Sequence, residues 1–175
     1  MIIMPARGTS TLSMIPDTIK AFANITPNKA ISVLDGGCGH GIYGHILKAL
    51  FQDKVTVYGC DVKHSPFIDG VYKEFYNASI REVLLENDFD CVLLLHVLEH
   101  MMKDEALSLI KLAQEACDYI VVGLPASRKG HVYRQDVNDP DSHKWGVHDF
   151  PFKSVRLEKY SKKYNIYTWR YKDAE

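Results

Sequence analysis

Residues 31–50 read ISVLDGGCGHGIYGHILKAL, and this stretch predicts a strand, a glycine turn and a helix in direct succession. The apolar run Ile31–Leu34 ends at an acid, Asp35, and a cluster of glycines follows it. Apolar residues then recur at the spacing of one helical face: Ile42, Ile46, Leu47 and Leu50. Glycines allow a tight turn and let a ligand touch the main chain, and the N-terminus of a helix favours an anion. The stretch therefore predicts a small-molecule pocket at the carboxyl end of a parallel strand.

Asp35, Gly37, Gly39 and Gly41 spell D-x-G-x-G-x-G, which resembles the first motif of class I methyltransferases that use S-adenosylmethionine. A second cofactor class, the dinucleotides, also fits this turn. Gly39, Gly41 and Gly44 spell the G-x-G-x-x-G of dinucleotide-binding proteins, and Asp61 follows 20 residues after Gly41. An acid at that place can accept hydrogen bonds from the ribose of either cofactor class, so it does not discriminate between them. A glycine-rich turn without any ligand is the third interpretation. The choice depends on the rest of the chain.

The totals favour one soluble domain. The chain has 175 residues, 46% of them hydrophobic, and a formal net charge of -1, which gives no reason to expect a nucleic acid or an anionic membrane as partner. We expect no signal peptide and no membrane span, and therefore a cytoplasmic protein. The four cysteines form no C-x-x-C pair and are expected to be buried thiols: Cys38, Cys60, Cys91 and Cys117.

Strand-like and helix-like segments alternate along the chain. Strands are expected at 31–34, 55–60, 72–76, 89–95, 119–123 and 166–171. Helices are expected at 42–50, 80–86, 103–117 and 153–164, after an N-terminal arm and helix within residues 1–28. This alternation predicts an α/β fold, a Rossmann-like parallel sheet of about six to seven strands with helices on both faces, in a single domain 1–175.

Residues 125–151 form a polar stretch that is too long for an ordinary connection. We interpret it as a lid or substrate loop over the strand ends, the alternative being a surface loop without a role. It also carries several groups that could ligate a metal: His131, Asp136, Asp139, Asp141, His143, His148 and Asp149. Their spacing matches no compact metal motif, so no metal is expected.

The segment 89–101, FDCVLLLHVLEHM, distinguishes between the two cofactors. It resembles the fourth-strand segment of small-molecule class I S-adenosylmethionine-dependent methyltransferases, of the type 11/23-like subgroup, and the D-x-G-x-G-x-G from Asp35 to Gly41 resembles their first motif. A full NAD site would need a second mononucleotide-binding half, and the chain has no second glycine turn. The resemblance implies an enzyme that transfers a methyl group from S-adenosylmethionine. It also implies a C-terminally trimmed sheet, because the family usually ends in a hairpin and one strand is evident here.

Family members hold the cofactor at positions that can be placed on this chain. The resemblance implies that Asp35 and the turn glycines hold the methionine end, that Asp61 binds the ribose, and that Val62 packs on the adenine. Ser79 and Ile80 would bracket the adenine edge, and His96 would lie beside the sulfonium. The expected cofactor-binding set is Asp35, Gly37, Gly39, Gly41, Asp61, Val62, Ser79, Ile80 and His96. Many relatives carry an acid at the position of Ser79 or of its direct neighbours, and this chain departs from them there.

Transfer to a hydroxyl or amine acceptor is assisted by a base that takes its proton, and histidines titrate near neutrality. The candidates for catalysis are His96, His100 and His143. The segment 130–150, GHVYRQDVNDPDSHKWGVHDF, resembles a pattern in a subgroup linked to glycan modification, so its substrate candidates are Gln135, Asn138, His143 and Trp145. We therefore expect O-methylation of a small hydroxylated, sugar-like acceptor. Trp145 and His143 could instead pin the loop to the core.

Three other functions stay open. The basic, aromatic tail 153–172 could suit RNA, although the fourth strand lacks the Pro-Pro tip of many base methyltransferases. A non-catalytic module could have kept the cofactor pocket, and an NAD-binding protein is the last alternative.

A homodimer is expected if a second subunit covers the sheet edge left by trimming.

Overall fold

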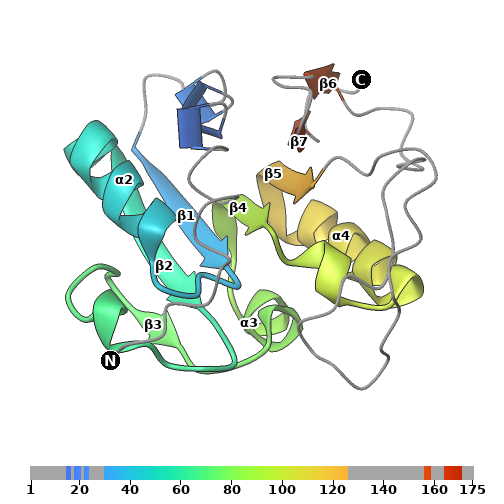
Figure 1. The fold of residues 1–175 in the computed structure, drawn as a ribbon, viewed down its shortest axis with the longest axis horizontal. Coiled ribbons are helices and arrows are strands. Elements are labelled where there is room, and N and C mark those ends of the chain that lie inside the picture. The colour runs from blue at the N-terminus through green and yellow to red at the C-terminus, as the bar shows by residue number, and fades with distance from the viewer. Residues whose placement is uncertain are drawn as a thin grey trace.

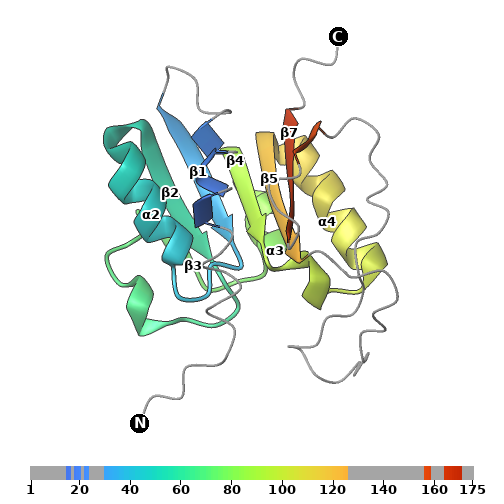
Figure 2. The same ribbon diagram turned by 45° about the horizontal axis from the view of Figure 1, so that its top comes forward.

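The computed structural model describes residues 15–16, 18–20, 22–23, 30–125, 156–158 and 164–170, which form a seven-stranded sheet with flanking helices (Figure 1). The strands are β1 Ile31–Gly36, β2 Val55–Cys60, β3 Phe75–Tyr76, β4 Phe89–Leu95, β5 Cys117–Pro125, β6 Arg156–Glu158 and β7 Tyr164–Arg170. Their order across the sheet is β3-β2-β1-β4-β5-β7-β6. The first five strands are parallel, whereas β7 runs antiparallel beside β5 and pairs with β6 (Figure 2).

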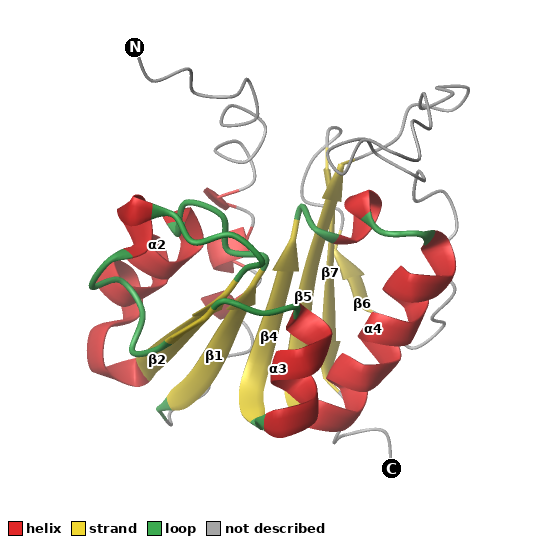
Figure 3. Cartoon of the chain, turned by 90° about the horizontal axis from the view of Figure 1, so that it is seen from below, coloured by secondary structure: helices red, strands yellow, loops and turns green. Residues whose placement is uncertain are grey.

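Helices cover both faces of the sheet (Figure 3). The described α-helices are α2 Ile42–Phe51, α3 Ile80–Glu86 and α4 Lys103–Ala116, and the 3-10 turns are η1 Gln52–Lys54, η2 Pro66–Ile68 and η3 Leu98–His100. One face packs on α2 and on the helical residues near Phe22, whose ring meets Phe51 at 4.9 Å. The other face packs on α3 and α4. The predicted α/β fold is therefore confirmed.

β4 is the centre of both packing layers. Cys91 and Leu93 point into the layer under α2, and Val92 and Leu94 point into the layer under α3 and α4. All four are fully buried, as an uninterrupted apolar run predicts for a parallel strand that is covered on both faces. This strand ends at Leu95, and His96 follows it beside the glycine turn after β1.

The C-terminal part differs from the expectation. A helix was expected over 153–164, but residues 156–158 are β6 and Tyr164 already begins β7. The three residues of β6 pair with β7: Arg156, Leu157 and Glu158. This pairing depends on another strand, so the local sequence pattern did not predict it. This short strand is the seventh of the sheet, and it gives the chain a closing hairpin of which one arm has only three residues. The expected third strand is also shorter, because only Phe75 and Tyr76 pair with β2.

The cysteines are free thiols, three of them buried and Cys38 partly exposed. In the described part of the chain, no helix combines the length and the apolar character that a membrane crossing requires. The proposed lid 125–151 lies outside the described residues, apart from Pro125 at the end of β5.

Candidate functional site

The carboxyl ends of β1, β2 and β4 meet at one edge of the sheet. Gly36 lies opposite Cys60 of β2 on one side and opposite Leu94 of β4 on the other. The glycine turn after β1, Asp61 after β2 and His96 after β4 are therefore neighbours. The strand order reverses between β1 and β4, which is where open α/β sheets bind their ligands.

The glycine turn is held tightly by its own backbone. Gly37, Gly39 and Gly41 have φ values of 70°, 53° and 74°, the left-handed region that favours glycine. The amides of Gly37 and Cys38 both donate to the Cys60 carbonyl, at 2.7 and 3.0 Å. The turn is thus bound to the end of β2.

Two of these glycines have different surroundings. A Cβ at Gly37 would lie 2.5 Å from Cγ2 of Val97, so this position is filled by the turn after β4. A Cβ at Gly39 would meet no described atom within 4 Å. As far as the described residues go, Gly39 therefore presents bare backbone that no side chain covers, which is the cradle that a ligand lying on the main chain needs.

Asp61 spans the glycine turn and the segment after β2. Its Oδ2 accepts a hydrogen bond from the Gly39 amide at 2.9 Å, and its Oδ1 accepts one from the Lys63 amide at 3.0 Å. The structure therefore brings together two residues that the sequence predicted for one ligand. It also places the carboxylate beside the open face of Gly39.

Asp35 is buried beneath the turn, with 2% of its surface exposed. Burial raises the pKa of this carboxyl from 3.8 to about 6, although hydrogen bonds from Tyr72 and from the Gly44 amide oppose that rise. The nearby charge of Asp61 raises the pKa slightly further. The Tyr72 hydroxyl donates to Oδ2 of Asp35 at 2.7 Å.

Tyr72 is a site residue that the sequence reasoning missed. Its ring lies between α2 and β2, where a Cβ at Gly44 would overlap the ring and a Cβ at Gly59 would lie 2.5 Å from Cδ2. A glycine inside a helix and another inside a strand often mark such a close approach. Those two glycines are the signal that could have indicated a large side chain here.

His96 has a positive φ of 58°, and its amide donates to the Gly123 carbonyl at 2.9 Å. Its Nδ1 lies 2.9 Å from Oε1 of Glu99, a carboxylate that is 1% exposed. A buried carboxylate at Nδ1 favours the tautomer with the proton on Nδ1 and leaves Nε2 as the basic nitrogen. His100 ends η3, and its amide donates to the Val97 carbonyl at 3.0 Å.

The three residues expected to contact the adenine differ in their exposure and in their hydrogen bonds. Ser79 caps α3: its hydroxyl accepts from the Glu82 amide at 3.2 Å and donates to the Glu82 carboxylate at 2.7 Å. Ile80 is 6% exposed and belongs to the core under α3. Val62 is 67% exposed, so it is available to a ligand. The Ser79 hydroxyl is engaged by the helix cap, and its contact with the adenine stays a prediction.

The remaining predicted site residues lie outside the described part of the chain: Gln135, Asn138, His143 and Trp145. Among the described residues, no three histidine, cysteine or acidic side chains lie close enough to hold a metal ion.

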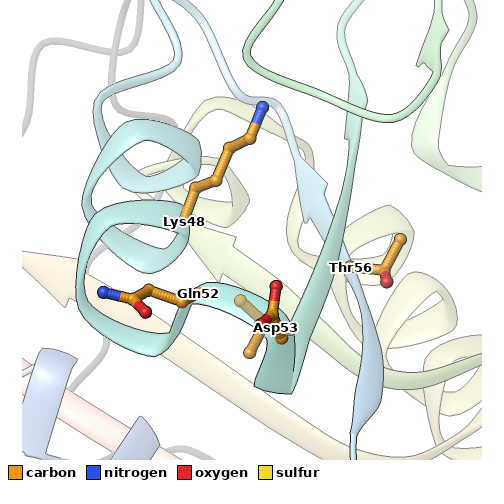
Figure 4. A pocket seen from close by; sticks show the side chains of 5 residues that line it. Lys48, Gln52, Asp53 and Thr56 are labelled. Carbon is orange, nitrogen blue, oxygen red and sulfur yellow. The ribbon is translucent and has the colours of Figure 1, made fainter.

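A hollow of about 600 Å³ lies away from this site (Figure 4). Its lining comes from the end of α2, from η1 and from the start of β2: Lys48, Gln52, Asp53, Val55 and Thr56. The glycine turn lies at the opposite end of β2, where Cys60 accepts its hydrogen bonds. The hollow is therefore separate from the candidate site.

Comparisons with known proteins agree on the fold. No protein-family model matches the sequence, and no curated protein matches it significantly. Solved methyltransferases do match the structure. Magnesium protoporphyrin IX methyltransferase from Synechocystis PCC 6803, with bound SAH, superposes with a TM-score of 0.64 at 14% identity, over 91% of this chain and 83% of that chain.

Two further structures have acceptors or sources of a different kind. 1,6-Didemethyltoxoflavin-N1-methyltransferase from Burkholderia thailandensis gives a TM-score of 0.65 at 18% identity, over 94% of this chain and 80% of that one. A SAM-dependent methyltransferase from Archaeoglobus fulgidus gives 0.62 at 21% identity, over 83% of this chain and 71% of that one. The chain therefore has the fold of class I S-adenosylmethionine-dependent methyltransferases.

Proposed function

We propose that this chain is an enzyme that transfers a methyl group from S-adenosylmethionine to a small hydroxylated acceptor. The observation that carries the proposal is the paired arrangement at the carboxyl end of β1 and β2. There, the Asp61 carboxylate lies 2.9 Å from the amide of Gly39, whose own face is open. This arrangement suits a ligand that has both a ribose and a chain lying against bare backbone.

The described residues fit this cofactor. Asp61 can accept hydrogen bonds from the two ribose hydroxyls, and the exposed Val62 can pack on the adenine. The amides of Gly37 and Cys38 are engaged by the Cys60 carbonyl, and the negative charge of the buried Asp35 would attract the ammonium group of the methionine end. Two of the solved structures described above hold S-adenosylhomocysteine in this fold, which supports the assignment.

When bound, the cofactor supplies an activated methyl group on a sulfonium. The chain then needs to hold an acceptor oxygen in line with that methyl group and to take its proton. We assign the proton to His96, because Glu99 holds its Nδ1 at 2.9 Å and directs basicity to Nε2. His100 and His143 remain further candidates for this role.

The acceptor is proposed from the loop 125–151. Its Gln135, Asn138, His143 and Trp145 combine amides, an imidazole and an aromatic surface, which suits a hydroxylated, sugar-like molecule. Two neighbours in this fold are named for different acceptors, magnesium protoporphyrin IX and 1,6-didemethyltoxoflavin. This variety supports placing acceptor choice in the loop rather than in the sheet.

A transfer assay separates the competing functions. The protein is incubated with isotopically methyl-labelled S-adenosylmethionine and with separate pools of sugars, hydroxylated metabolites and RNA, and the labelled products are identified by mass spectrometry. We expect an O-methylated small molecule. A labelled RNA would favour the nucleic-acid alternative, and cofactor binding without transfer to any pool would favour a non-catalytic module.

We further propose a cytoplasmic protein that forms a homodimer. The free thiols of Cys60, Cys91 and Cys117 suit a reducing compartment. The edge strand β6 has only three residues and could be covered by a second subunit. Light scattering during size exclusion would test the dimer, and a monomer at micromolar concentration would contradict it.

A further inference from the structure

Tyr72 connects three parts of the candidate site, although it belongs to the irregular segment between β2 and β3. Its hydroxyl donates to Oδ2 of Asp35 at 2.7 Å, across 37 positions of the chain. Both partners are buried, with 9% of Tyr72 and 2% of Asp35 exposed. A buried hydrogen bond to a carboxylate is strong, and water does not compete with it.

The Tyr72 ring occupies a slot that exists because three neighbouring residues are glycines. A Cβ at Gly44 on α2 would overlap the Cε1 side of the ring, a Cβ at Gly59 on β2 would overlap the Cδ2 side, and a Cβ at Gly41 would lie 3.3 Å from the hydroxyl oxygen. A ring held in this slot loses little further freedom when its hydroxyl binds Asp35. The slot therefore specifies where the hydroxyl points as well as where the ring packs.

We propose that Tyr72 is a positioning residue for the cofactor. Its hydroxyl holds the Asp35 carboxylate in the orientation and the charged form in which that carboxylate attracts the ammonium group of the methionine end. This inference rests on the proposed function, because it assumes that S-adenosylmethionine binds at the glycine turn. It assigns a role in ligand binding to a residue that does not itself touch the ligand.

The groups around Asp35 make its ionisation sensitive to this one hydroxyl. Burial raises the pKa of Asp35 to about 6, the charge of Asp61 adds to that rise, and the Tyr72 hydroxyl and the Gly44 amide oppose it. The thiols of Cys38 and Cys60 also face this acid, but burial raises the pKa of each to about 12, so they are neutral below pH 8. Burial likewise raises the pKa of Tyr72 above its usual range, so its hydroxyl keeps its proton and remains a donor.

Removal of the hydroxyl should therefore affect binding in a pH-dependent manner. Without the Tyr72 donor, the pKa of Asp35 in the free protein rises, by about one unit as an order of magnitude for one such hydrogen bond. Protonated Asp35 attracts the ammonium group less, so the affinity should fall mostly at low pH. We expect a loss of about fivefold at pH 6 and almost none at pH 8.

The test is calorimetric titration of S-adenosylhomocysteine from pH 5.5 to 8 into wild type, Tyr72→Phe and Tyr58→Phe. Phenylalanine keeps the ring in its slot between Gly44 and Gly59 and removes only the donor. Tyr58→Phe is the matched control, because the Tyr58 hydroxyl accepts from Lys73 at 3.0 Å and lies on the neighbouring strand β2. Thermal unfolding of each variant checks that the fold is kept.

An upward shift of the pH midpoint in Tyr72→Phe, with the control unchanged, supports the proposal. An equal loss of affinity at every pH would mean that the Tyr72 hydroxyl does not act through the charge of Asp35, and unchanged affinity would mean that the hydroxyl is unimportant; either result overturns the proposal. If wild type binds no ligand, the proposed function fails first, so the two failures can be told apart. If Tyr72→Phe does not fold, site-specific 3-fluorotyrosine at position 72, a stronger donor of nearly the same shape, should shift the midpoint to lower pH, and no shift would overturn the proposal.

Discussion

At the scale of single residues, the charge of the buried Asp35 carboxylate lowers the free energy of unfolding of the ligand-free protein at neutral pH. Burial raises its pKa to about 6, against 3.8 for the ordinary carboxyl, so the folded state binds this proton more tightly than the unfolded state does. Its contribution to stability is complete below about pH 4, falls as the pH rises to about 6, and stays low above that. We therefore infer that the charged carboxylate is kept for binding and not for stability.

The first prediction concerns Asp35→Asn. The amide can still accept the Tyr72 hydrogen bond but carries no charge, so we expect the free energy of unfolding at pH 7.5 to increase by on the order of 2 kcal/mol. At pH 4 the two proteins should be nearly equal. Urea unfolding at both pH values measures this, and Asp53→Asn, at an exposed position on η1, is the control. Equal free energies of unfolding of wild type and Asp35→Asn at pH 7.5 would show that the charge of the buried carboxylate does not destabilise the fold.

The second prediction concerns Asp61, whose carboxylate is proposed to bind the ribose. Asp61→Ala removes charge-assisted hydrogen bonds, so the Kd for S-adenosylhomocysteine should rise roughly 10- to 100-fold. Asp61→Asn keeps an acceptor for the Gly39 amide and should lose less. Asp69→Ala is the control, because that acid pairs with the exposed His64 at 3.2 Å. An unchanged Kd in Asp61→Ala would remove the ribose assignment.

The third prediction concerns the tautomer of His96. The Glu99 carboxylate, 2.9 Å from Nδ1 and 1% exposed, should hold the proton on Nδ1 in the neutral ring. Long-range 1H–15N correlation spectra at pH 8 measure this, and the signal that disappears in His96→Gln identifies the residue. A proton on Nε2 instead would contradict the proposed role of His96 as the base.

At the scale of elements, local patterns predicted most of the sheet and helices. α3 and β4 occur at the expected residues 80–86 and 89–95, because a complete capping box at Ser79 and an unbroken apolar run are both signals local in sequence. β3 and β6 were harder, since strands of two and three residues depend on their partners for definition. The expected helix over 153–164 fails for this reason at residues 156–158.

The candidate site divides in the same way. The glycine turn and Asp61 were predicted, and the structure joins them by a hydrogen bond of 2.9 Å. Tyr72 was not predicted, because its contact with Asp35 spans 37 positions and no motif accompanies it. Gly44 and Gly59 both lie against the Tyr72 ring, and this shared contact is visible only in the three-dimensional structure.

The fourth prediction tests this packing between α2, β2 and Tyr72. In a helix interior, Gly→Ala is usually stabilising by roughly 1 kcal/mol. At Gly44 the new Cβ would overlap the Tyr72 ring, so we expect Gly44→Ala to lower the free energy of unfolding by about 1–3 kcal/mol. In a Tyr72→Ala background the same change should be neutral or stabilising. Additive effects in this double-mutant cycle would show that the ring does not occupy the slot.

At the scale of the whole molecule, the strand order β3-β2-β1-β4-β5-β7-β6 places the site. The order reverses beside β1, so the glycine turn, Asp61 and His96 lie at one edge although they are far apart in the sequence. The sequence supported the alternation of strands and helices but not the position of the C-terminal hairpin, which depends on pairing with β5. Within the described part of the chain the sheet has seven strands, although β6 has only three residues.

The fifth prediction tests the central claim, and calorimetric titration of the wild-type chain with S-adenosylhomocysteine measures it most directly. We expect saturable one-to-one binding with a Kd in the micromolar range, about −7 to −8 kcal/mol, and no binding of NAD under the same conditions. No detectable heat with millimolar S-adenosylhomocysteine, or tight binding of NAD instead, would contradict the account.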